Sequence, residues 1–188
     1  GDFIHVFPAL AVPALGLAAA ATGPGGEVAA AAPRRVARIA VAGLALLAAL
    51  TTIPVFLSAS LAARAAATWP QRPAGALADL HRAGDIDPLS SDAPLQEGLV
   101  AAAVGDRVRA RSAFAEAARR DSRGWFARLE LAILSAQGGD RAGALRLLAE
   151  VARLNPREPS LATTRAGILR GRPPDPLAVA RGVVKRGG

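Results

Sequence analysis

The amino-acid sequence predicts an all-α protein in which two transmembrane helices are followed by a short array of helical hairpins. Three observations lead to this prediction. Residues 39–63 contain no charged side chain, and residues 4–21 form a second apolar stretch. Most charged residues follow Ala63, so the chain changes there from an apolar to a charged composition. Beyond it, two segments repeat each other at a spacing of 34 residues.

The segment from Ile39 to Ala63 is the stronger of the two predicted membrane helices. About 20 apolar residues cross the ~30 Å hydrocarbon core of a membrane, and this segment exceeds that length without a charge. A buried core helix is the alternative, but a core helix of this length normally carries a polar face. Pro54 is expected to kink the helix or to mark its end.

The segment from Ile4 to Ala21 is predicted as the other membrane helix, with a signal-peptide core as the alternative. The loop between the two segments carries basic residues, which favour the cytoplasmic side (Arg34, Arg35 and Arg38). The sequence therefore predicts a multi-pass protein of the cell membrane, in contact with membrane lipid, whose residues 64–188 are extracytoplasmic. Basic residues also follow the second segment, so charge separates the two orientations poorly.

Residues 87–120 and 121–154 align without a gap as two copies of one unit. Both copies contain Gly-Asp-Arg, and their apolar neighbours fall into the same register. A chance recurrence of three residues would not align the neighbours, so the sequence predicts a structural repeat. The aligned pairs are Gly98 and Ala132, Gly105 and Gly139, Asp106 and Asp140, Ala110 and Ala144, and Phe114 and Leu148.

This unit resembles the tetratricopeptide repeat, a helix–turn–helix motif with the same 34-residue period. Gly98 and Ala132 occupy the small position of its first helix, and Pro156 occupies its closing proline. The pairs at 110/114 and 144/148 follow the Ala-x-x-x-Phe pattern of its second helix. The family's Trp and Tyr positions hold other residues in both units, which predicts thinner packing.

The resemblance implies tetratricopeptide-like helical hairpins over residues 74–170. Half-units at 74–83 and 159–170 would cap the stack, because each unit buries its apolar face only against a neighbour. Residues 64–73 are then a linker between the membrane region and the repeats. Residues 171–188 are predicted to be a mobile or loosely docked tail.

The Gly-Asp pair has a mechanical interpretation at the turn of each hairpin. Glycine can adopt the left-handed conformation that closes the first helix. Aspartate can accept a hydrogen bond from the free N–H groups that open the second helix, and its charge suits the helix dipole there. A phosphate-binding loop is the alternative, but the sequence has no G-x-x-x-x-G-K-[ST] motif.

The first residues of the chain resemble a segment of bacterial O-antigen ligase-like membrane proteins, the polysaccharide ligase and polymerase superfamily. The residues that match are Asp2, Phe3, Pro8, Ala9 and Leu10. The order of regions also agrees, since a basic loop, a span and a tetratricopeptide-like tail follow in such proteins. The resemblance implies that this chain is the C-terminal part of a glycan ligase or polymerase and that its catalytic loops lie upstream of Gly1.

Composition argues against most kinds of catalytic or metal site. The chain has no Cys and only two His, which excludes thiol catalysis and cysteine-rich zinc sites. It has no Tyr, so aromatic platforms for nucleic acid are unlikely despite the net charge of +8. No catalytic residue, cofactor or metal ligand is therefore predicted.

The predicted function is that of a membrane-anchored helical-repeat module that binds a protein partner or an envelope glycan. A stand-alone membrane-anchored tetratricopeptide scaffold for protein assembly is one alternative. A module that binds anions through its basic surface is another. Trp125 and Phe126, which begin a repeat helix, are a candidate partner surface, although packing against the neighbouring unit is their default role.

Overall fold

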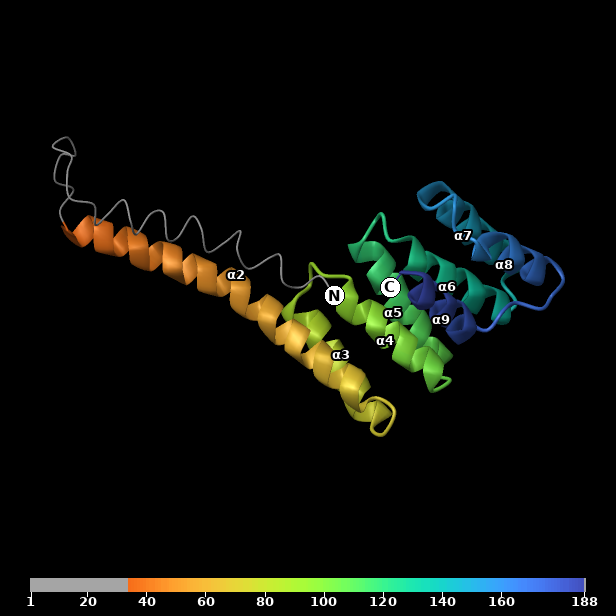
Figure 1. The fold of residues 1–188 in the computed structure, drawn as a ribbon, viewed down its shortest axis with the longest axis horizontal. Coiled ribbons are helices and arrows are strands. Elements are labelled where there is room, and N and C mark those ends of the chain that lie inside the picture. The colour runs from red at the N-terminus through yellow and green to blue at the C-terminus, as the bar shows by residue number, and fades with distance from the viewer. Residues whose placement is uncertain (1–33, 188) are drawn as a thin grey trace. The chain divides into compact units, whose positions relative to one another are not determined.

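The computed structural model describes residues 34–187, and this part of the chain is entirely α-helical. Contacts divide the chain into two compact units, residues 1–47 and 48–188, and the helix from Arg34 to Thr68 crosses the boundary between them. Figure 1 shows the helices. They are α2 (Arg34–Thr68), α3 (Pro73–Ile86), α4 (Asp92–Ala103), α5 (Arg107–Arg120), α6 (Trp125–Gln137), α7 (Arg141–Leu154), α8 (Ser160–Leu169) and α9 (Pro176–Gly187).

The prediction of membrane-spanning helices, and with it a multi-pass membrane location, is wrong for the described residues. Between residues 34 and 187, no helix combines the length and the apolar character that crossing a membrane requires. The uncharged run at 39–63 is not a separate element, because α2 begins at Arg34 and continues beyond Arg64 to Thr68. The other predicted span, residues 4–21, lies outside the described residues.

The last turns of α2 pack on protein. Ala65 is fully buried, in one core cluster with Ala76 and Leu80 of α3. Arg64 lies 3.4 Å from the Asp79 carboxylate. The helix therefore also covers the first half of the predicted linker.

From α3 to α8 the second unit is a helical-repeat solenoid built from antiparallel hairpins. The hairpins α4–α5 and α6–α7 correspond to the two sequence repeats, and α3 and α8 lie at the two predicted half-units. Neighbouring hairpins join through α3 with α4, α5 with α6, and α7 with α8. Each second helix ends at the recurring unit boundary, since the C-cap residues are Asp87, Asp121 and Asn155.

Three residues separate the helices inside each complete hairpin, and a Gly-Asp pair forms the last two of them. Gly105 has φ +82° and Gly139 has φ +89°, the left-handed conformation that residues with a side chain rarely adopt. In the first turn, the Gly105 N–H donates to Ala102 O (3.1 Å) and the Asp106 N–H donates to Ala101 O (2.9 Å). These two bonds close α4 as a Schellman motif. The second turn repeats the pattern at positions 34 residues later.

The aspartate of each turn opens the next helix. The Asp106 side chain accepts from the Arg109 N–H at 3.0 Å, and the Asp140 side chain accepts from the Gly143 N–H at 2.7 Å. One residue thus completes the end of one helix with its backbone and caps the start of the next with its side chain. This double use of one residue allows the chain to reverse within the three residues between the helices.

Small residues let the two helices of a hairpin approach closely. A Cβ at Gly98 would lie 2.7 Å from the Phe114 ring, so only glycine fits opposite that side chain. The second hairpin places Ala132 at this position and the smaller Leu148 opposite it. The side chains at the predicted helix-packing positions are buried to the extent of at least 96% (Ala110, Phe114, Ala132, Ala144 and Leu148).

The buried side chains form two core clusters. The first joins the end of α2, α3, α4 and α5, with Ala127 and Leu134 of α6. The second joins α6, α7 and α8, with Leu129 and Ile133 of α6 at its centre, and Val179 of α9 packs against it. Helix α6 therefore contributes to both clusters.

We expect Gly105→Ala to lower the free energy of unfolding by about 1–2 kcal/mol, because alanine in the left-handed conformation is strained. A Cβ there would meet no atom within 4 Å, so the cost comes from the backbone alone. Urea denaturation followed by circular dichroism measures it. Gly75→Ala, at an exposed helical site that is equally open, is the matched control and should leave stability unchanged or slightly raised. Equal effects of the two changes would contradict this account.

Candidate interaction surface

The last helix, α9, lies on a face made by the first helices of the two complete hairpins. It packs against α4 and α6, as Figure 1 shows, and we call the surface that it covers the α4/α6 face. Pro176 and Ala180 of α9 are buried, and Leu177 and Val179 are half-buried. This spacing places small and apolar side chains on one side of a helix.

The path of the chain before α9 explains how this helix reaches the face. Helix α8 ends at a third left-handed glycine, Gly171 (φ +69°), but no aspartate follows it. The chain instead continues through two prolines, and α9 starts with Pro176 after Asp175, whose Oδ1 accepts from the Leu177 N–H at 3.2 Å. Gln137 of α6 donates from Nε2 to Pro174 O at 3.2 Å, which fixes this segment against α6.

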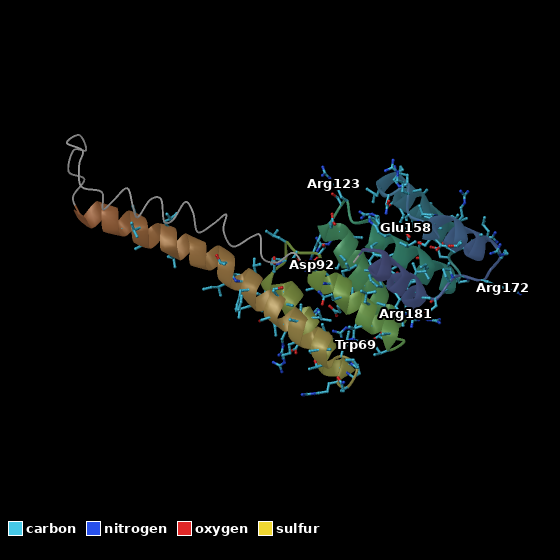
Figure 2. The ribbon with its side chains drawn as sticks, viewed as in Figure 1. Trp69, Asp92, Arg123, Glu158, Arg172 and Arg181 are labelled. Atoms are coloured by element: carbon cyan, nitrogen blue, oxygen red, sulfur yellow. The ribbon has the colours of Figure 1, made fainter. Side chains whose placement is uncertain are left out.

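An apolar groove of about 610 Å³ runs beside α9. Trp69 just beyond α2 and Leu99 and Val100 of α4 line one part of it, and Leu177 and Ala180 of α9 line another. Arg181 borders the groove on the α9 side; Figure 2 labels this side chain and Trp69. Helix α9 therefore fills only part of the apolar surface available to it.

A buried carboxyl group lies on α6 near the start of α9. Glu130 is fully buried, and neither of its carboxyl oxygens has a hydrogen-bond partner. Burial, and then the negative charge of Asp175, raise the pKa of Glu130 to about 8. Its counterpart in the preceding repeat, Gln96, lines the groove beside α9. Glu130 thus occupies the α6 position that corresponds to a groove-lining position of α4.

A second, polar groove of about 970 Å³ lies across α3, α4 and α5. Most of its charged groups are paired with one another: Arg109 donates from Nε to Glu97 at 2.7 Å, and His81 lies 3.6 Å from the same carboxylate. Hydrogen bonds from Arg119 and Arg120 lower the pKa of Glu116. Within the described residues, no three metal-ligating side chains come together. This groove has the features of a structural ion-pair surface.

Several of these arginines bond backbone carbonyls at the joints between helices. The Arg120 guanidinium, which is largely buried, donates from one nitrogen to Gly84 O, Asp87 O and Ser90 O at 3.0–3.1 Å. Arg128 likewise donates to three carbonyls at the α5–α6 turn. These bonds satisfy carbonyls left free at helix ends.

Some of the site residues predicted from the sequence lie inside the hairpins, and others are exposed or half-buried at their edges. The repeat-defining glycines, aspartates and apolar residues lie in the turns and helix contacts described above, and Pro156 is exposed in the turn after α7. Trp125 and Phe126 are half-buried and contact each other edge to face at 5.8 Å between ring centroids. Trp125 packs against the second core cluster. Their role as a partner surface stays a prediction.

The α4/α6 face was not predicted, because residues 171–188 were predicted only as a mobile or loosely docked tail. A signal was present, since Pro176, Leu177, Val179 and Ala180 follow the spacing of an amphipathic helix. Glu130 gave no signal, because an isolated glutamate in a repeat helix usually lies at the surface.

No protein-family model and no curated protein sequence matches this chain. The resemblances to tetratricopeptide repeats and to O-antigen ligase-like proteins therefore stay predictions. The residues that carry the second resemblance lie between positions 2 and 10, outside the described residues.

We expect Ala180→Glu to detach α9, because Ala180 is only 6% exposed and a charged side chain cannot be buried there without a partner. Hydrogen exchange measured by mass spectrometry should show loss of amide protection in α9, with α5 and α7 unchanged. Ala178→Glu, at an exposed position of the same helix, should have no such effect. Equal protection of α9 in both variants would rule out this docking.

The buried Glu130 should make stability depend on pH. Its pKa is about 8 in the folded chain, against an ordinary value of 4.5, so the folded state retains a proton that the unfolded state releases. The free energy of unfolding should therefore fall as pH rises from about 4.5 to 8, by up to about 1.4 kcal/mol per pH unit, and change no further above that. Urea denaturation at several pH values, with Glu130→Gln as reference, measures this difference. A pH dependence shared by both chains would exclude Glu130 as its source.

Proposed function

We propose that the helical-repeat unit is a protein-interaction module that binds an amphipathic helix of a protein partner on the α4/α6 face. In this complex the partner helix takes the place of α9. The observation that carries the proposal is that α9, an amphipathic helix, already lies on this face.

Helix α9 indicates which ligand chemistry fits the face. Its contact residues are small or apolar, and its exposed side bears Ala178 and Arg181. The groove beside it is lined mainly by apolar side chains, among them Leu99 and Val100. A helix with a narrow apolar stripe and a polar outer side meets these requirements, as in other helix-in-groove complexes.

Helix α9 has the features of a displaceable occupant. Its main contacts are with α4 and α6, and its described apolar side chains are either small or half-buried. By contrast, α4 and α6 are enclosed by neighbouring helices on their other sides. Removal of α9 would therefore expose the face without dismantling the hairpins. Low local stability, as expected for a helix with few contacts, is typical of elements that are displaced when a partner binds.

A labelled peptide of residues 172–188 serves as a model partner helix, and fluorescence anisotropy measures its binding to the full-length chain. In the wild-type chain the tethered α9 competes at an effective concentration in the millimolar range. The Ala180→Glu chain frees the face, so we expect it to bind the peptide at least about tenfold more tightly than the wild-type chain.

Two matched variants control this experiment. Ala178→Glu leaves α9 docked and should bind the peptide as weakly as the wild-type chain. Leu99→Glu, added to Ala180→Glu, places a charge in the groove lining and should abolish the gain. Binding that is unaffected by Leu99→Glu would place the peptide elsewhere, and no binding to the Ala180→Glu chain would refute the proposed site.

A further inference from the structure

The α4/α6 face contains one buried acidic group that its present occupant leaves unsatisfied. Both oxygens of Glu130 lack a hydrogen-bond partner, although the residue is fully buried. Buried polar groups are nearly always hydrogen-bonded, because leaving one unpaired costs free energy. An unpaired carboxyl at a surface that exchanges its occupant therefore indicates a missing ligand group.

Helix α9 is electrostatically mismatched to this position. Asp175, the residue just before α9, lies near Glu130, and its negative charge disfavours ionisation of the Glu130 carboxyl. The described basic residue of α9, Arg181, lies further along the helix, where it borders the groove and donates from Nε to Leu177 O. The helix thus brings an acidic group where a basic one would pair with Glu130.

The two repeats differ at this position, so the α4 half and the α6 half of the face are chemically different. Gln96 stands in α4 where Glu130 stands in α6, and Gln96 is neutral. Only the α6 half of the face therefore carries an ionisable group at this register. A partner helix with one basic residue would be oriented with that residue over α6.

We propose that Glu130 is the charge-recognition residue of the α4/α6 face and that it binds a lysine or arginine side chain of a partner helix at the place that Asp175 now occupies. This inference rests on the proposed function. It also explains why α9 can serve as a replaceable occupant: a partner with the basic residue satisfies the carboxyl that α9 leaves unpaired. Pairing with the basic group would convert Glu130 to its carboxylate and release its proton to solvent.

The full-length chain can test this recognition without an identified partner, because Asp175→Arg turns α9 itself into the matched ligand. This substitution is made in the wild-type chain and in the Glu130→Gln chain, and hydrogen exchange measures the protection of the α9 amides. Loss of the Asp175 cap affects both backgrounds equally, so the comparison isolates the coupling between the two positions. We expect Asp175→Arg to protect α9 about tenfold more with Glu130 present than with Glu130→Gln.

A charge-matched control separates local pairing from a general effect of positive charge. Asp175→Asn combined with Ala178→Arg changes the net charge equally but places the arginine at an exposed position. It should show the same α9 protection in both backgrounds. Equal protection by Asp175→Arg in both backgrounds would overturn the role of Glu130 and leave the interaction site intact. Absence of α9 protection in every chain, wild type included, would instead refute the docking on which the proposed function rests.

Discussion

The Gly-Asp turn is the constraint on which the rest of the repeat unit depends. Left-handed Gly105 and Gly139 let the backbone close one helix, and the aspartate that follows caps the next. With the reversal completed in three residues, the paired helices lie antiparallel and in fixed register. Only then do Gly98 and Phe114 face each other, and only then do the first helices form a continuous face that another helix can cover.

Arginine bonds to backbone carbonyls maintain the stacking between hairpins. Arg120 connects the end of α5 to the α3–α4 turn, and Arg128 connects α6 to the end of α5. A guanidinium presents five donors in a fixed fork and can bridge several acceptors, whereas an ammonium acts as a point charge. The many arginines that appear in the sequence as a basic surface thus include several with structural partners. This reduces the number of guanidinium groups whose donors are free to bind anions.

The helical hairpins could be predicted from the sequence because local patterns of residues indicate them. A 34-residue period, small residues at helix contacts and Gly-Asp turns each have a physical meaning that needs no knowledge of the fold. The transmembrane prediction relied on an uncharged run without a polar face, but no helix among the described residues is long and apolar enough to cross a membrane. The buried position of Ala65 depends on α3, a long-range contact that no local window contains. The α4/α6 face and the burial of Glu130 depend in the same way on where α9 docks.

Helix α6 contributes side chains to both core clusters, so unfolding of one cluster affects a helix that the other cluster also uses. Ala127 and Leu134 belong to the first cluster, whereas Leu129 and Ile133 belong to the second. Separation of α7 and α8 would break the second cluster and leave the first with its own helices. Such a chain has two cooperative folding subunits that share one helix, so its C-terminal part can unfold transiently while the N-terminal hairpins stay native. In a solenoid this short, the boundary between the two cooperative folding subunits therefore lies within one helix, α6, and not between two neighbouring helices.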